Sequence, residues 1–200
     1  MPVRAVAFDV GGVLTQAGHV HEVRERWQER LGMTAAEFSA APAGVDPDGL
    51  AFTGLLTESQ YKARLAAALG QSLAQAGEFM ADMCGELDAG LFAYAASLRP
   101  RYATAILSDA IGGARREYQA RYGFAQLVDV IIYSCEVGLV KPDPRVYRLL
   151  CDRLAVAPGE LVFLDDRPEN VQGAGELGIQ ALLHETTAQS IRMLEALLAA

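Results

Sequence analysis

The feature that most constrains the fold is an apolar run that ends on a carboxylate and two glycines. Residues 6–14 read VAFDVGGVL, so that Asp9 directly follows the run and Gly11 and Gly12 come just after it. The apolar run is typical of a buried strand, and the glycines break it and allow a tight turn. Open parallel α/β sheets bind ligands at the carboxyl ends of their strands. We therefore expect Asp9 to lie at a ligand site.

The second half of the chain alternates between strand-like and helix-like segments. After a first strand at 3–9, strands are expected at 102–107, 128–133, 161–164 and 179–183. Helices are expected at 88–98, 113–122, 144–154 and 168–177, followed by a C-terminal helix. Alternation of this kind is typical of a parallel sheet covered by helices on both faces. The sequence therefore predicts an α/β fold with a Rossmann-like parallel sheet.

A helical segment separates the first strand from the rest of the predicted sheet. One helix is expected at 20–31, and a capping box formed by Thr34 and Glu37 opens a second. Two more are expected at 57–69 and 72–84. The stretch at 42–54, rich in Pro, Gly and Asp, is expected to be a loop. A chain of 200 residues has room for one full core and a modest inserted module. We expect residues 1–14 and 89–200 to form the core domain and residues 15–88 to form the inserted helical domain.

Three later stretches carry polar residues at comparable positions. Ser108 and Asp109 end the strand at 102–107, Lys141 lies in the loop sequence VKPDP, and Asp165 and Asp166 end the strand at 161–164, with Asn170 shortly after them. With the first stretch and in this order, they resemble the four signature motifs of the haloacid dehalogenase superfamily. The resemblance implies a hydrolase, and it implies that the helical insertion is the cap that closes over the substrate.

The resemblance also implies a role for each residue of these motifs. Asp9 would be the nucleophile that forms an aspartyl phosphate, with Ser108 and Lys141 as the other catalytic residues. Gly11, Ser108, Asp109 and Lys141 would bind phosphate. Asp9, the backbone carbonyl of Gly11, Asp165 and Asp166 would hold Mg²⁺, with Asp166 a direct ligand and Asp165 and Asn170 direct ligands or support.

The adjacent carboxylates favour a metal on physical grounds too. Asp165 and Asp166 have Arg167 as their only basic neighbour, so without a cation they would repel one another. Asp166 could instead cap the helix that begins at Pro168. Capping explains one of the two carboxylates, whereas Mg²⁺ binding explains both.

Two positions depart from the usual pattern of the superfamily's phosphatases. Gly11 stands where a second Asp usually serves as general acid and base, as in the Asp-x-Gly branch that includes bacterial glucose-1-phosphate phosphatases and the phosphatase domain of soluble epoxide hydrolase. Asp109 stands where Asn is more usual. It would either transfer the missing proton or hold a loop, and repulsion between a carboxylate and phosphate favours the loop. His19 and His21 are further candidates for the proton transfer.

These features predict a metal-dependent phosphatase of a small phosphorylated metabolite, such as a sugar phosphate. One alternative is a 2-haloacid dehalogenase, which in this superfamily keeps the Asp nucleophile and uses no metal; the Asp165 and Asp166 pair argues against it. Another is a catalytically weak phosphate-binding or regulatory protein, which Gly11 and Asp109 keep open.

Composition limits the kinds of binding partner and the cellular compartment that we expect for this chain. A net charge of −8 argues against a nucleic-acid partner, and the sequence has no apolar run approaching a membrane span. The three cysteines fit no metal-binding spacing and cannot all pair within the chain, which favours a reducing cytoplasm. No feature indicates an obligate protein partner.

Overall fold

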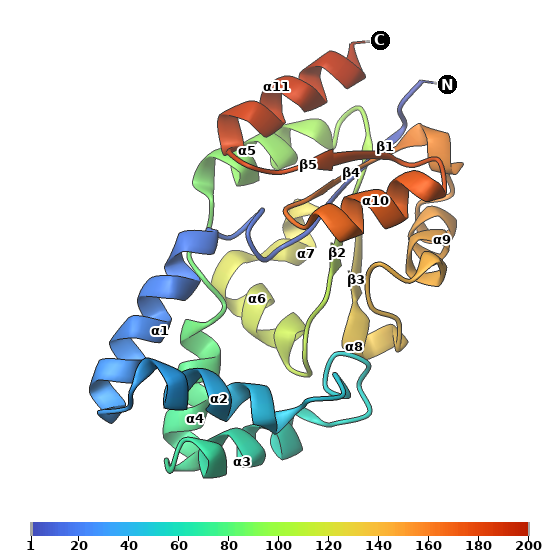
Figure 1. Ribbon diagram of the computed structural model, residues 1–200. Helices are drawn as coiled ribbons and strands as arrows, with labels where there is room; N and C mark the ends of the chain where they lie inside the picture. Colours follow the sequence, from blue (N-terminus) through green and yellow to red (C-terminus); the bar gives the residue numbers. More distant parts are fainter. Residues whose placement is uncertain (1, 200) are drawn as a thin grey trace.

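The sheet at the centre of the molecule is parallel throughout, as shown by the computed structural model, which describes residues 2–199 (Figure 1). Its strands lie in the order β3-β2-β1-β4-β5, and every neighbouring pair is parallel. They are β1 (Ala5–Phe8), β2 (Ala103–Ser108), β3 (Val130–Tyr133), β4 (Leu161–Asp165) and β5 (Gln180–Leu183). The predicted fold class, a Rossmann-like α/β sheet, is confirmed.

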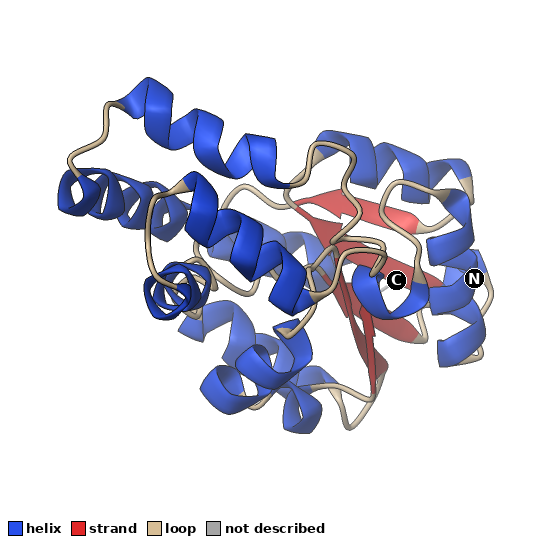
Figure 2. Cartoon of the chain, turned by 90° about the horizontal axis from the view of Figure 1, so that it is seen from below, coloured by secondary structure: helices blue, strands red, loops and turns tan. Residues whose placement is uncertain are grey.

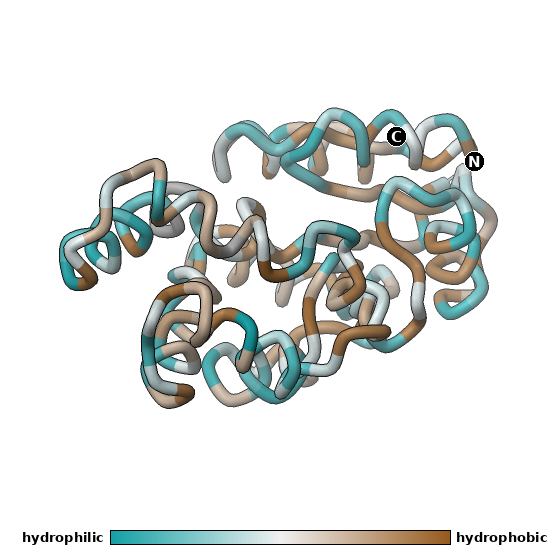
Figure 3. Tube along the Cα trace, turned by 60° about the horizontal axis from the view of Figure 1, so that its bottom comes forward, coloured by the Kyte–Doolittle hydropathy of each residue, from teal (hydrophilic) through white to brown (hydrophobic). Residues whose placement is uncertain are grey.

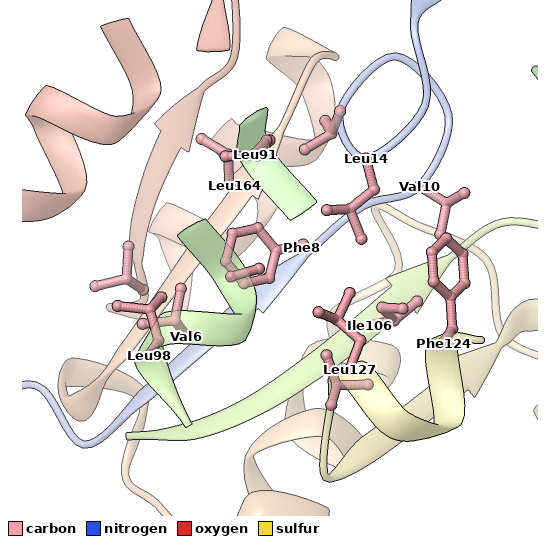
Figure 4. Packing of buried hydrophobic residues seen from close by; sticks show 14 of the residues in the cluster. Val6, Phe8, Val10, Leu14, Leu91, Leu98, Ile106, Phe124, Leu127 and Leu164 are labelled. Carbon is pink, nitrogen blue, oxygen red and sulfur yellow. The ribbon is translucent and has the colours of Figure 1, made fainter. Parts of the chain in front are cut away.

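Helices cover both faces of the sheet because neighbouring residues of a strand point to opposite faces. On β1, Val6 and Phe8 pack into one buried cluster, whereas Ala5 and Ala7 pack into another. The first cluster, shown in Figure 4, includes residues of α5 (Ala89–Leu98), α7 (Phe124–Leu127) and α11 (Thr187–Leu198), and α6 (Ala114–Tyr122) packs against it. The second includes residues of α9 (Pro144–Leu154) and α10 (Pro168–Glu176). The result is a sheet between two helical layers.

Residues 15–88, which lie between β1 and α5, form a helical layer to one side of the sheet (Figure 2). Its helices are α1 (Ala17–Leu31), α2 (Ala35–Val45), α3 (Glu58–Ala68) and α4 (Leu73–Asp82), and Figure 3 shows hydrophobic and hydrophilic residues alternating along them. They share a buried cluster of their own that includes Trp27, Phe38, Leu65 and Phe79. We call this segment the cap, and its assignment as a separate domain of residues 15–88 stays a proposal.

The two chain segments that join the cap to the core lie side by side. Thr15 and Leu87 form an antiparallel bridge, and the backbone N–H of Gln16 donates to the carbonyl of Glu86 at 2.8 Å. Both covalent connections between the cap and the core therefore lie at the same place.

The predicted loop at 42–54 begins too early, because α2 continues through Pro42 to Val45. A proline removes one backbone N–H from a helix. Burial of Phe38 and Val45 in the cap cluster outweighs that loss, so packing overrides local preference. Helix α1 also begins earlier than expected, at Ala17. Three short elements were not predicted, namely α7, α8 (Ser134–Val137) and a 3₁₀ turn at Pro158–Glu160.

No helix among residues 2–199 combines the length and the apolar composition needed to cross a membrane.

Candidate active site

The carboxyl ends of three neighbouring strands bring the predicted site residues to one edge of the sheet. Asp9 follows the central strand β1, Ser108 ends β2 on one side of it, and Asp165 ends β4 on the other. The backbone N–H of Asp9 donates to the carbonyl of Leu164 at 2.9 Å, which fixes Asp9 beside β4. Strands β2 and β3 extend the sheet on one side of β1, and β4 and β5 extend it on the other. Such a reversal of strand order opens a crevice at this edge.

Lys141 joins two of these carboxylates below the surface. Its Nζ lies 2.9 Å from Oδ1 of Asp9 and 2.7 Å from Oδ2 of Asp165, and all three side chains are buried. Burial would lower the pKa of Lys141, but Asp9, Asp165 and Asp109 together raise it. Burial raises the pKa of Asp9 to about 7, against the opposing attraction of Lys141. The lysine is therefore held as a cation between two acids.

Asp165 is held by donors on both of its oxygens. Oδ1 accepts the side-chain amide N–H of Asn170 and the backbone N–H of Arg167, each at 2.9 Å, and Oδ2 accepts from Lys141. The phenol of Tyr147 donates to the carbonyl of Asn170 at 2.9 Å. These contacts fix the orientation of the Asp165 carboxylate.

Asp166 completes a group of carboxylates that fits a divalent cation. Oxygen atoms of Asp9, Asp165 and Asp166 lie within 4.8 Å of one another. Gly12 has a positive φ of 75°, and a Cβ added there would overlap the Asp166 carboxylate, so glycine is what lets the loop approach it. Burial and the neighbouring Asp165 raise the pKa of Asp166. Closely spaced carboxylate oxygens of this kind are the ligands that Mg²⁺ prefers.

The capping alternative for Asp166 is wrong. The N-cap of α10 is Arg167, which makes no side-chain capping bond, and Asp166 lies one residue before it.

Asp109 holds the loop that carries Lys141. Its Oδ1 accepts the backbone N–H of Lys141 at 3.0 Å, while its Oδ2 is buried and has no hydrogen-bond partner among the described residues. Burial raises the pKa of Asp109. The contact matches the loop-holding interpretation. Ser108, beside it, is buried at the end of β2.

The other candidates for proton transfer are placed differently. Gly11 is exposed, and nothing lies within 4 Å of where its Cβ would be, so the position of the usual second Asp is open space. His21 is exposed on α1, where its Nε2 lies 3.1 Å from Oε1 of Glu25 on the same helix. The side chain of His19 lies outside the described part of the structure.

A cavity of about 450 Å³ between the cap and the core was not anticipated from the sequence. It is bounded by Asp109 and the residues just after it on the core side, and by Tyr61, Lys62 and Phe79 on the cap side. Glu58 links the two sides, since its two carboxylate oxygens accept from the two terminal nitrogens of the Arg116 guanidinium at 3.2 and 2.7 Å. Residues brought together from α3, α4 and α6 share no local sequence signal, so only the tertiary structure reveals this cavity.

Comparison with known proteins connects the chain to hydrolases of more than one kind. The (S)-2-haloacid dehalogenase 1 of Pseudomonas sp. (strain CBS-3) is 29% identical over 202 residues, covering 90% of this chain and 84% of that protein. The phosphoserine phosphatase of Thermus thermophilus is 35% identical over 92 residues, covering 45% of this chain and 37% of that protein. The bifunctional epoxide hydrolase 2 of Mus musculus is 42% identical over 71 residues, which are 36% of this chain and only 13% of that protein.

Similarity in three dimensions extends over nearly the whole chain. The crystal structure of a HAD family enzyme from Bacteroides thetaiotaomicron, in complex with magnesium, superposes with a TM-score of 0.77 at 19% identity, covering 96% of this chain and all of that one. The sequence also matches the family of haloacid dehalogenase-like hydrolases over residues 3–178. The chain therefore belongs to the haloacid dehalogenase-like hydrolase family.

Proposed function

We propose that this hydrolase is a metal-dependent phosphatase of a small phosphorylated metabolite and that it works through an aspartyl phosphate on Asp9. The observation that carries the proposal is the convergence of the Asp9, Asp165 and Asp166 oxygens within 4.8 Å of one another. Carboxylates packed this closely repel one another unless a cation lies among them. A phosphate ester brings more negative charge to the same place, which increases the need for that cation.

In the proposed reaction, each residue at this edge of the sheet has its own role. A carboxylate oxygen of Asp9 attacks phosphorus, the bond to the leaving oxygen breaks, and water then cleaves the acyl phosphate and restores the carboxylate. Lys141 offsets the negative charge of Asp9 and of the phosphate from its buried position. The Ser108 hydroxyl and the Asp109 backbone N–H lie at the end of β2, where they would donate to phosphate oxygens.

Mg²⁺ would be held by Asp9, Asp166 and the carbonyl of Gly11, with Asp165 as a ligand or as support. When bound it would draw negative charge from the phosphate oxygens. The Asp165 carboxylate already accepts three donors, which favours the supporting part for it.

Haloacid dehalogenation is the second candidate. It is favoured by the Pseudomonas dehalogenase, which aligns with 90% of this chain. The cluster of three carboxylates, Asp9, Asp165 and Asp166, argues against dehalogenation, because a reaction that needs no metal does not require three converging acids.

Turnover assays on the Asp9→Asn variant and on the metal-depleted protein test the proposal. The amide is nearly isosteric but cannot form the acyl phosphate, so hydrolysis of a generic aryl phosphate should fall below detection. Asp152→Asn, at an exposed position on α9, is the matched control and should retain wild-type turnover. Activity should also stop in excess EDTA and return with Mg²⁺. Chloride release from 2-haloacids in EDTA would instead identify a dehalogenase, and binding of phosphate without any turnover would identify a regulatory protein.

A further inference from the structure

The cavity between cap and core contains a cation that the proposed reaction does not use. Lys62 is one of only two lysines in the sequence, and the other is Lys141. It lies on α3 and lines the cavity, and no hydrogen bond or ion pair of its ammonium group is found within residues 2–199. Lys62 is half-buried, and an ammonium group that is partly shielded from solvent interacts more strongly with an anion than a fully exposed one does. This ammonium is therefore free to pair with a ligand.

Gly77 fixes where the ammonium lies. A Cβ added at Gly77 would come within 2.5 Å of Nζ and 2.8 Å of Cε of Lys62, so the lysine tip rests on the surface of α4 where a side chain is missing. Gly77 lies in the interior of α4, where alanine is the better helix former by about 1 kcal/mol. The glycine therefore weakens the helix while leaving room for the lysine.

The acidic side chains that line the cavity are already engaged. Glu58 lies one turn before Lys62 on α3 and attracts it, but both of its oxygens accept from Arg116. Glu117 accepts from Arg116 at 3.2 Å, and Asp109 accepts the backbone N–H of Lys141. Arg24, the remaining cation on the wall, donates to the Ser39 hydroxyl at 3.3 Å and lies over the ring of Phe38. Within the described part of the structure, Lys62 is the cation on the cavity wall for which no such partner is found.

The remaining walls are largely apolar. They include Phe52, Leu65, Phe79, Met80, Met83 and Tyr118. The cavity starts at Asp109, next to the proposed phosphate site, and its volume of about 450 Å³ suits a small organic group. It can therefore take the part of a substrate that leaves with the ester oxygen.

We infer that the substrate is a phosphate monoester whose leaving group carries an apolar body and a carboxylate, and that Lys62 pairs with this carboxylate. The inference rests on the proposed phosphatase function and adds the class of substrate to it. An uncharged sugar would leave the ammonium unpaired among apolar walls, whereas a carboxylate would form a charge-assisted hydrogen bond with it.

Matched aryl phosphates test the inference. We expect wild-type enzyme to hydrolyse 4-carboxyphenyl or 3-carboxyphenyl phosphate with a kcat/KM at least about tenfold above that of the corresponding carbamoylphenyl phosphate, which has nearly the same shape and no charge. Lys62→Met should abolish this preference and leave the carbamoyl substrates nearly unchanged. Lys62→Arg should retain part of it, and Arg24→Met should leave it intact. Gly77→Ala should reduce it without loss of thermal stability, because the methyl group displaces the ammonium.

Two results would overturn the inference: an equal preference in wild type and Lys62→Met, or an equal loss in Arg24→Met and Lys62→Met. A binding measurement separates this failure from failure of the phosphatase proposal. Calorimetry with 4-carboxybenzylphosphonate, which cannot be hydrolysed, should show weaker binding to Lys62→Met than to wild type. If no aryl phosphate is hydrolysed but this difference remains, the reaction is wrong and the carboxylate site stands. If hydrolysis occurs without the difference, the site is wrong and the reaction stands.

Discussion

Lys141 Nζ lies 2.9 Å from Asp9 Oδ1, and the two side chains are 1% and 9% exposed. A cation buried against a carboxylate favours its ionised form, and in the proposed reaction the same cation would offset the charge of an incoming phosphate. We therefore expect the proposed reaction and the stability of this edge of the sheet to depend on the same ion pair.

Replacement of Lys141 by Met should affect both properties. Removing one partner of a buried ion pair typically costs about 3–5 kcal/mol, and here it leaves the carboxylates of Asp9 and Asp165 facing each other. We expect a lower denaturant midpoint and a fall in kcat/KM of at least ~10². Chemical denaturation and steady-state kinetics measure the two effects. Arg145→Met, at a surface residue paired with Asp143, is the control and should change neither by much. A fully active Lys141→Met enzyme would remove Lys141 from the mechanism.

Asp9 should make the metal-free protein less stable as the pH rises. Burial raises the pKa of its carboxyl from 3.8 to about 7, so between these values the folded state binds more protons than the unfolded state. Stability then decreases with increasing pH across this window, and the full penalty is present above pH 7. We expect the Tm in EDTA to fall between pH 5 and pH 8, less so in Asp9→Asn, and Mg²⁺ to raise it at pH 8.

The comparison with Asp9→Asn is needed because other groups titrate in the same range. Burial lowers the pKa of His184 from 6.5, which gives the opposite slope below that pH. The difference between wild type and Asp9→Asn cancels this contribution. Identical slopes in the two proteins would show that Asp9 does not carry a raised pKa.

We expect Asp165 to have mainly a structural role and Asp166 to bind the metal. Asp165 accepts three donors, so Asp165→Asn should lower the Tm by several degrees. Asp166 is half-buried and lies against Gly12, with no side-chain donor found for it in the described part of the chain. Asp166→Asn should therefore change the Tm little while raising the Mg²⁺ concentration for half-maximal activity by about tenfold or more. Metal titrations and thermal melts of both variants provide the measurement, and the reverse pattern would exchange the two roles.

The sequence predicted this edge of the sheet because every site residue except Lys141 ends a strand or follows one closely. Asp9, Ser108 and Asp165 lie at apolar-to-polar boundaries, and parallel strands bring such boundaries to one edge. Lys141 has no comparable local signal, and its place in the prediction came only from the resemblance to a family. The cavity was missed for a related reason. Lys62 and Gly77 meet through the packing of α3 against α4, which periodicity within either helix does not specify.

Gly11 should make the rate depend steeply on the leaving group. With no acid at this position, the leaving oxygen departs with its charge, so log(kcat/KM) for substituted phenyl phosphates should fall steeply as leaving-group pKa rises. A Cβ at Gly11 would meet open space, whereas one at Gly12 would overlap Asp166. Gly11→Asp should therefore fold normally and flatten the plot by accelerating poor leaving groups, by up to ~10². Its KM should rise because the added carboxylate repels phosphate.

Gly12→Asp is the matched control, and it should lose activity towards every substrate because the new side chain displaces Asp166. The plots are informative only where chemistry limits the rate, which a solvent-viscosity test establishes. A flat plot for the wild-type enzyme under those conditions would mean that another group already supplies the proton. Asp109 would then be the first residue to replace, because its Oδ2 is buried with no hydrogen-bond partner among the described residues and burial raises its pKa. A steep wild-type plot that Gly11→Asp leaves unchanged would mean instead that an acid at this position cannot reach the leaving oxygen.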